Sequence, residues 1–386
     1  MSPFKSDRIW NQHVFLGPPI SSSRRRRSGR APLILSATTV REGSSHPLGD
    51  DVPGGRLSVI KHAVSADQDT VRRSQLTLSY TETYRLIGRD PSSTSFATPA
   101  PRSMFNPYTR TAYLPGMVES ACSSTWDMFE FPTMSLEMVP SILPLVATTY
   151  KNTFFSSSLV DRETRFNIRL LRLYLGRELP STIHELQPGL RSDLGLDVSR
   201  YIRLDKALQG IAPLPPLHDV AYGMGRILAQ LHYGVGIDGM DIELVLGGDG
   251  DHGLRCWVID YNQCERWLPP QPLSHLGTGL ATTGRYASGS LDDGARRLAK
   301  RISALEHYYP RPHQSLYSHF QAGYRVGVTA SIDKYRPKPP TAAWAAEAEA
   351  VVQAGEAFLE TYEIKSKESL EAKARIAARR QKVANV

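Results

Sequence analysis

The sequence predicts an α+β fold in which strands precede helices along the chain. Three observations carry this prediction: the alternating pattern of residues 168–175, the helical spacing of apolar residues at 218–232, and a tail rich in Ala, Glu, Lys and Arg from 342 onward. Strands and helices that segregate along a chain are typical of α+β proteins. At 386 residues, the chain is long enough to bury a sizeable core in one large or two moderate domains.

The composition excludes several classes of protein. Apolar content of 41% is ordinary for a globular chain. The sequence has no apolar run of about 18 residues, so no membrane span is predicted. The N-terminus lacks the apolar segment of a secretory signal. Three cysteines do not suit a disulfide scaffold, so we expect a reducing, cytoplasmic environment. The net charge of +8 comes largely from Arg24–Arg30 and the tail 365–382, and such solvated runs do not favour a nucleic-acid partner.

The first part of the chain predicts a few strands separated by irregular segments. Residues 1–56 are rich in Pro, Ser, Gly and Arg and are expected to be largely disordered, apart from an apolar run at Leu33–Leu35 that favours a strand. Alternation over Leu57–Ala63 predicts a strand with Lys61 near its end. A mixed sheet is therefore expected from residue 57 to about 150.

The middle of the chain adds a helix and two more strands. Residues 67–86, which include Glu82, have an amphipathic pattern typical of a helix, whereas residues 96–113 are turn-rich. A strand at 136–143 is predicted to lie at a sheet edge, because prolines stand at 140 and 144. The alternation of apolar and basic residues at 168–175 predicts another strand.

Helices dominate the rest of the chain. The helix predicted at 218–232 buries one apolar face and has Asp219 near its start. A second helix is expected at 315–326. Within the C-terminal region 331–386, the stretch from 342 to about 384 predicts one long helix or two. We therefore expect a helical part from 151 to 330, followed by a helical tail.

Two acidic segments follow the helix at 218–232. The first, His232–Gly248, carries Asp238, Asp241 and Glu243, and the second ends the apolar run 257–259 with Asp260. A carboxylate at the end of a buried strand costs free energy unless a partner compensates it. Because residues 247–255 form a turn rich in Gly and Asp, the two segments are predicted to pair as a hairpin.

The predicted hairpin has a definite register. Antiparallel pairing of 238–246 with 256–260 returns Asp260 to the side of Asp241 and Ile242. Acids this close disfavour each other's ionisation unless Lys61, an arginine or a metal compensates them. We therefore expect one cleft that holds Asp238, Glu243 and Asp260, with Asn262 and Gln263 at its rim.

Residues 57–326 resemble a fungal family of unknown function that bears the label "zinc finger protein". The most specific part is the helix ending in Leu-His, then D-x-x-D-x-E-x-V-L-G from Asp238, then Asp260-Tyr-Asn-Gln-Cys. Further matching segments are LEMVPSILPL at 136–145, RLLRLYLGR at 169–177 and YYPRPHQSLYSHFQAGY at 308–324. Cys256 and Cys264 are eight positions apart without a second finger-spaced pair, so the zinc label finds no support and we expect no metal site.

The order of helix, acidic loop, hairpin and strand-end aspartate is that of a protein kinase, and the family resembles a distant relative of that fold. The resemblance implies a degenerate two-lobe body with a C-terminal helical extension. Asp238 then matches the catalytic base, Glu243 the metal-binding Asn and Asp260 the metal-binding Asp. Lys61 matches the phosphate-pairing lysine and Glu82 its partner. The chain departs from kinases because no Gly-rich loop precedes Lys61.

Function remains open among three classes at this point. Association of the family with natural-product genes implies a cofactor-free cyclase or isomerase, such as a Diels–Alder-type pericyclase, that acts on a hydrophobic metabolite of fungal secondary metabolism. The alternatives are a residual small-molecule kinase and a non-catalytic pseudokinase-like binding module.

The predicted catalytic residues are Asp238, Glu243, Asp260 and Lys61. The predicted substrate-binding residues are Tyr261, Asn262, Gln263, His232 and Asp241. Each also has a structural interpretation, since aspartates cap turns and His232 can hold a helix end by a hydrogen bond.

Overall fold

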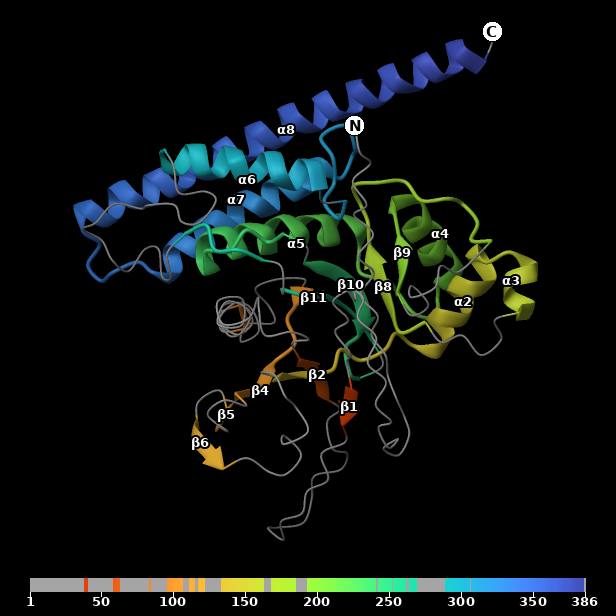
Figure 1. Cartoon of the computed structure of the whole chain (residues 1–386), viewed down its shortest axis with the longest axis horizontal. Helices are drawn as coiled ribbons and strands as arrows, with labels where there is room; N and C mark the ends of the chain where they lie inside the picture. Colours follow the sequence, from red (N-terminus) through yellow and green to blue (C-terminus); the bar gives the residue numbers. More distant parts are fainter. Residues whose placement is uncertain are drawn as a thin grey trace, which may run out of the picture.

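Figure 1 shows two sheets and a stack of long helices in the computed structural model. The structure describes residues 38–40, 58–62, 83–84, 96–106, 111–114, 117–121, 133–162, 168–184, 193–240, 242–251, 253–261, 264–268, 289–305 and 307–384. The predicted strand at 33–35 and nearly all of the helix predicted at 67–86, including Glu82, lie outside these ranges. The described elements are a mixture of strands and helices, which confirms the α+β class.

The first sheet is antiparallel throughout and has the order β1-β2-β7-β4-β5-β6. Its strands are β1 (Thr38–Val40), β2 (Ser58–His62), β4 (Pro101–Asn106), β5 (Thr111–Leu114), β6 (Met117–Ala121) and β7 (Thr133–Glu137). Strand β2 confirms the prediction at 57–63, and Lys61 lies opposite Met134 of β7.

The prediction for the strand at 136–143 was wrong in two respects. Strand β7 ends at Glu137, and it lies inside the sheet between β2 and β4. Both prolines that suggested an edge strand stand beyond β7, so every residue of the strand itself can donate to its neighbours. Residues 138–143 instead form a linker that leads to the helix starting at Pro144.

The second sheet is mixed and has the order β3-β11-β10-β8-β9. Its strands are β3 (Phe96–Ala97), β8 (Leu170–Leu173), β9 (Asp193–Leu196), β10 (Glu243–Gly248) and β11 (Leu254–Ile259). Strand β8 confirms the strand predicted at 168–175 with shorter bounds. The description of residues 96–113 as turn-rich was incomplete, because this stretch contains β3, β4 and most of β5.

Helices cover one face of the second sheet. Figure 1 shows α5 lying across this sheet, with α6, α7 and α8 stacked beyond it and α2 to α4 beside β8 and β9. The helices are α2 (Pro144–Phe154), α3 (Ser157–Arg162), α4 (Val198–Leu208), α5 (Leu217–Ala229), α6 (Leu291–Leu305), α7 (Tyr317–Lys334) and α8 (Ala342–Ala384).

The main core lies between this sheet and α5. Leu244, Leu246 and Val258 point into the same buried cluster as the apolar face of α5. The intervening residues Val245 and Trp257 belong to a smaller cluster on the opposite face, as the two-residue period of a strand requires. The hairpin β10–β11 is therefore buried on both faces, which fixes its register.

Helix α5 confirms the prediction at 218–232 and ends in an unusual way. It has Asp219 in its first turn and continues into a π-helical segment, Gln230–Val235. Gly236 closes this segment in the left-handed conformation, with φ of 81°. π-Helical turns are rare and are frequent at functional sites, and this one delivers the chain directly to Asp238.

Two glycines let α5 and α7 pack with their backbones in contact. A Cβ atom at Gly225 would overlap the carbonyl oxygen of Phe320, and one at Gly323 would overlap that of Tyr222. Helix axes approach this closely only where small residues form the contact. The position of α5, and hence of the loop that follows it, is thus set by α7.

Helix α8 confirms the expected helical tail and is a single helix. Val351, Phe358 and Tyr362 are buried where α8 packs on α6 and α7, whereas its C-terminal end projects beyond the body in Figure 1. Helix α7 extends to Lys334, beyond the predicted 315–326, because Gly327 continues the helix in close contact with α5, where a Cβ atom would overlap the Arg226 carbonyl oxygen. In the part of the chain that the structure describes, none of the helices has the length and apolar content of a membrane span.

Candidate functional site

The acidic hairpin forms with the predicted register. Glu243 pairs with Ile259 and Leu246 with Cys256, in an antiparallel ladder. Continuing this ladder by one residue brings Asp260 opposite Ile242. The chain after Asp260 then returns to the loop at Asp238, where the Asp238 N–H donates to the Glu265 carbonyl at 2.8 Å. The loop and the strand end thus lie together, as predicted.

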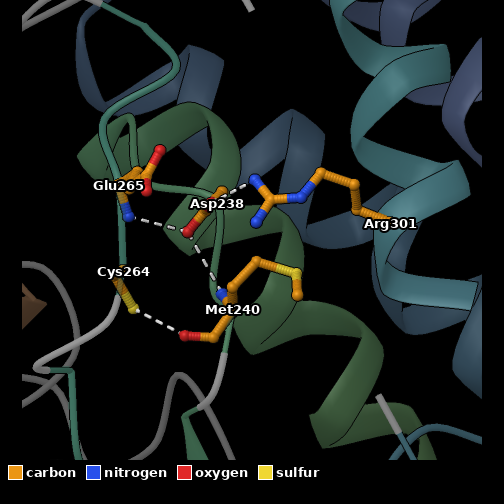
Figure 2. Close-up of polar contacts among 5 residues, drawn as sticks. All are labelled: Asp238, Met240, Cys264, Glu265 and Arg301. Carbon is orange, nitrogen blue, oxygen red and sulfur yellow. Dashed lines mark hydrogen bonds and ion pairs between the residues drawn. The ribbon is translucent and has the colours of Figure 1, made fainter. Parts of the chain in front are cut away.

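The Asp238 carboxylate accepts from two backbone N–H groups and lies beside an arginine. Its Oδ1 accepts from the Met240 N–H at 3.2 Å and from the Glu265 N–H at 2.9 Å. Its Oδ2 lies 3.4 Å from Nη1 of Arg301, and its side chain is 0% exposed. Figure 2 shows Arg301 reaching this carboxylate from α6, opposite the loop that carries Glu265. A carboxylate held in this way joins three segments of the chain.

The loop contact continues through a cysteine. The Cys264 thiol donates to the Met240 carbonyl at 3.4 Å, beside the contacts of Asp238 (Figure 2). A second buried thiol, Cys256, lies in β11, and burial raises its pKa to about 12. Both thiols are buried, and neither forms a disulfide.

Glu243 forms a close ion pair with an arginine of the neighbouring strand. Its Oε1 lies 2.6 Å from Nη2 of Arg172, and the two side chains are only 7% and 14% exposed. Arg172 is the residue of β8 that pairs with Val245, so the two charges are diagonal neighbours on one face of the sheet. A buried carboxylate beside a guanidinium is compensated in charge and keeps little affinity for an added cation.

Asp260 occupies a conformation that is uncommon for a side-chain-bearing residue. It is the one described residue other than glycine with a positive φ, of 66°. The left-handed region costs about 1–2 kcal/mol for an L-residue, less for Asp and Asn. Such conformations persist where the surroundings enforce them, and they cluster at functional sites.

The neighbour of Asp260 anchors the end of the hairpin. Tyr261 is buried, and its hydroxyl shares a hydrogen bond of 3.1 Å with Oγ1 of Thr98, just after β3. Because β3 runs parallel to β11, this bond fixes the chain on both sides of Asp260. Tyr261 therefore supports the end of the hairpin in this structure, and a contact between Tyr261 and a substrate stays a prediction.

His232 is part of an aromatic core. Its Nδ1 shares a hydrogen bond of 2.8 Å with the Tyr324 hydroxyl, and its carbonyl accepts from the indole N–H of Trp267 at 2.8 Å. Phe358 packs edge-on against the imidazole and stacks on Tyr324. The side chain is fully buried, so the predicted contact of His232 with substrate has no support in the structure.

The burial of His232 predicts a pH-dependent stability. Loss of solvation lowers its pKa from 6.5 to about 3, so the folded state holds a neutral ring while the unfolded state binds a proton below pH 6.5. The contribution is complete above pH 6.5 and is lost as the pH falls toward 3. Relative to His232→Phe, the wild type should lose about 1.4 kcal/mol of unfolding free energy per pH unit between pH 6 and 4.

Urea titrations at several pH values measure the difference in unfolding free energy between the wild type and His232→Phe. The titration of the carboxylates is common to both proteins and cancels in this difference. His218→Gln is the matched control, because His218 is exposed beside Asp219. Parallel pH profiles for the wild type and His232→Phe would show that the ring is not held neutral.

The remaining predicted site residues are placed only in part. Lys61 lies in β2 of the first sheet. Asp241, Asn262 and Gln263 lie outside the described residues. Two ion-pair partners of the acids, Arg172 and Arg301, were not predicted. The basic alternation in 168–175 was the available signal for Arg172, whereas nothing local in α6 distinguishes Arg301 from its neighbours.

The described residues offer no cluster of side chains that is suited to bind a metal ion. Within the described residues, no three side chains of His, Cys, Asp or Glu come together in a group suited to a metal ion. Glu243 is paired with Arg172, and Asp238 with Arg301 and two backbone N–H groups. Comparison of the chain with protein-family models, curated proteins and solved structures finds no match.

Proposed function

We propose that this chain is a metal-independent enzyme, a cyclase or isomerase that acts on a hydrophobic metabolite. The observation that carries the proposal is the charge compensation of its acids: Arg172 holds Glu243 and Arg301 holds Asp238. Acids neutralised by internal cations can shape a site and orient a substrate, but they offer little to Mg²⁺. Chemistry that needs only proximity and polarisation fits such a site.

A degenerate protein-kinase-like body is part of this proposal. It is supported by the succession of the first sheet, the linker 138–143, helix α5, the loop at Asp238, the hairpin and Asp260. The long helix α8 would be the C-terminal extension. Strands β8 and β9, which enlarge the hairpin sheet, are a departure from the simple kinase order.

Asp260 is the residue that we assign to substrate contact. It follows the hairpin directly, and its left-handed backbone and its burial support a fixed position for its side chain. Apolar residues of the same hairpin, Val245, Trp257 and Ile259, form a small cluster on the sheet face away from α5. These residues are buried, so they support the end of the hairpin that carries Asp260.

A non-catalytic binding module is the second candidate. The burial of Asp238 favours it, because a carboxylate with 0% exposure and three donors is poorly placed to remove a proton from a substrate. A residual small-molecule phosphotransferase is the third, and the pairing of Glu243 with Arg172 speaks against it.

Variants of Asp260 test the assignment. Asp260→Gly and Asp260→Asn should unfold at nearly the wild-type urea concentration, because both residues adopt positive φ at low cost, whereas Asp260→Ala should lose about 1 kcal/mol. All three should lose turnover of conjugated polyenes, measured as loss of ultraviolet absorbance with unchanged product mass. Wild-type turnover in Asp260→Asn would remove this residue from the site, and binding without turnover in the wild type would favour the binding module.

A further inference from the structure

Arg169 is held against the linker between the two sheets. It directly precedes β8, and its carbonyl accepts from the Ile142 N–H at 2.8 Å. Its Nε donates to Oγ of Ser141 at 3.2 Å, and its Nη2 donates to Sδ of Met138 at 3.1 Å. The guanidinium thus lies along the linker 138–143 in a fixed orientation.

The charge of Arg169 is uncompensated in the part of the chain that the structure describes. Both of its side-chain acceptors are neutral, and a thioether sulfur is a weak acceptor. Arg172 faces Glu243 and Arg325 faces Glu356 at 2.7 Å. Arg200 and Arg203, like Arg169, donate to neutral acceptors among the described residues. Half-burial lowers the pKa of the Arg169 guanidinium, which reflects the cost of keeping this cation away from water.

The surroundings of the guanidinium are rigid. The Gly248 N–H donates to the Pro140 carbonyl at 2.8 Å, which ties the linker to the end of β10. A Cβ atom at Gly247 would lie 2.7 Å from Cγ1 of Val139, so the strand and the linker touch at this point. A donor group held by a rigid frame needs little reorganisation to bind a ligand.

We propose that Arg169 binds the oxyanion, a carboxylate or a phosphate, of a small-molecule ligand at the linker 138–143. A guanidinium has five N–H donors, and those unused by Ser141 and Met138 can meet the two oxygens of such a group as a fork. Half-burial favours a small ligand over a protein surface. The site does not use Asp260 itself, although Val139 of the linker belongs to the same small apolar cluster as Trp257 and Ile259.

Anion titrations test the site. Melting temperature and calorimetric affinity are measured with sodium phosphate and, separately, sodium acetate, at constant ionic strength against sodium chloride. The wild type should show saturable stabilisation by at least one probe, and Arg169→Gln should bind it about ten- to a hundredfold more weakly. A response to phosphate alone identifies a phosphate ligand, and a response to acetate identifies a carboxylate.

Two further variants make the result decisive. Arg169→Lys keeps the charge but loses the fork, so it should bind with intermediate affinity. Arg203→Gln is the matched control, because Arg203 is exposed and donates only to backbone carbonyls, and it should respond as the wild type does. Without added anion, Arg169→Gln should be at least as stable as the wild type, since it removes a desolvated charge.

Three outcomes would overturn the proposal. The first is a wild type without a saturable response to either probe. The second is an equal response in the wild type and in Arg169→Gln. The third is an Arg169→Gln protein that unfolds or is less stable without anion, which would make the guanidinium a structural clamp of the linker.

Discussion

Gly323→Ala is expected to destabilise the protein strongly, at the upper end of the roughly 1–3 kcal/mol that overpacking costs. The added Cβ would overlap the backbone carbonyl of Tyr222 in α5, and a backbone atom cannot rotate away as a side chain can. The helices α5 and α7 must therefore separate. Because α5 leads into the loop at Asp238, turnover should fall together with stability. Urea unfolding followed by tryptophan fluorescence measures the first effect.

Gly355→Ala in α8 is the matched control for this substitution. Its Cβ would lie 3.0 Å from a methyl group of Val328, which can shift, and alanine gains up to about 1 kcal/mol of helix propensity over glycine. The control should therefore be nearly neutral or slightly stabilising. Equal stability of the two variants would show that α5 and α7 are not in backbone contact.

Arg172→Met should cost about 3–5 kcal/mol of unfolding free energy, because it leaves Glu243 buried without its cation. Glu243→Leu should cost a similar amount, because it removes the carboxylate that compensates Arg172. The double variant Arg172→Met, Glu243→Leu should recover much of the loss, since apolar residues of similar volume replace a buried pair with little penalty. The coupling free energy of this double-mutant cycle measures the interaction.

Arg325 and Glu356 provide the control cycle. They form a two-bond pair at 2.7 and 2.8 Å, but both side chains are about half exposed. Solvent screening reduces the value of such a pair to at most about 1 kcal/mol. A coupling at Arg172 and Glu243 no larger than at this exposed pair would contradict the view that Arg172 compensates a buried acid.

Sequence patterns predicted the elements that hydrophobic periodicity and turn residues determine. The spacing of Val220, Met224 and Ile227 was sufficient for α5, and the Gly- and Asp-rich turn was sufficient for the hairpin and its register. Both elements are buried on the faces that their periodicity indicates. The position of Asp260 at the end of β11 followed from the same pattern.

Other features depend on contacts between distant segments and were not predicted. Strand β4 contains Pro, Ser and Asn, and β3 has only two residues, so local propensity is weak and pairing with β7 and β11 stabilises them instead. The proline-based edge assignment for β7 failed because the strand ends before Pro140.

The candidate site shows the same division. The acids Asp238, Glu243 and Asp260 were found from sequence, because carboxylates at strand ends and in loops stand out. Their partners Arg172 and Arg301 come from β8 and α6, and only the sheet order and helix stacking bring them to the acids. The proximity of the acids predicted that an arginine, Lys61 or a metal compensates them, but the sequence pattern did not indicate which of these it is.

The measurement that tests the account most directly is thermal unfolding of the wild type with EDTA, with Mg²⁺, and with Mg²⁺ and ATP together. Because arginines already compensate Glu243 and Asp238, the account predicts the same melting temperature in all three conditions. A nucleotide present at about 100 times its Kd would instead stabilise the protein by roughly 2.7 kcal/mol, which is easily seen. A saturable rise in melting temperature with Mg²⁺ and ATP, lost in Asp260→Ala, would contradict the account and restore the phosphotransferase.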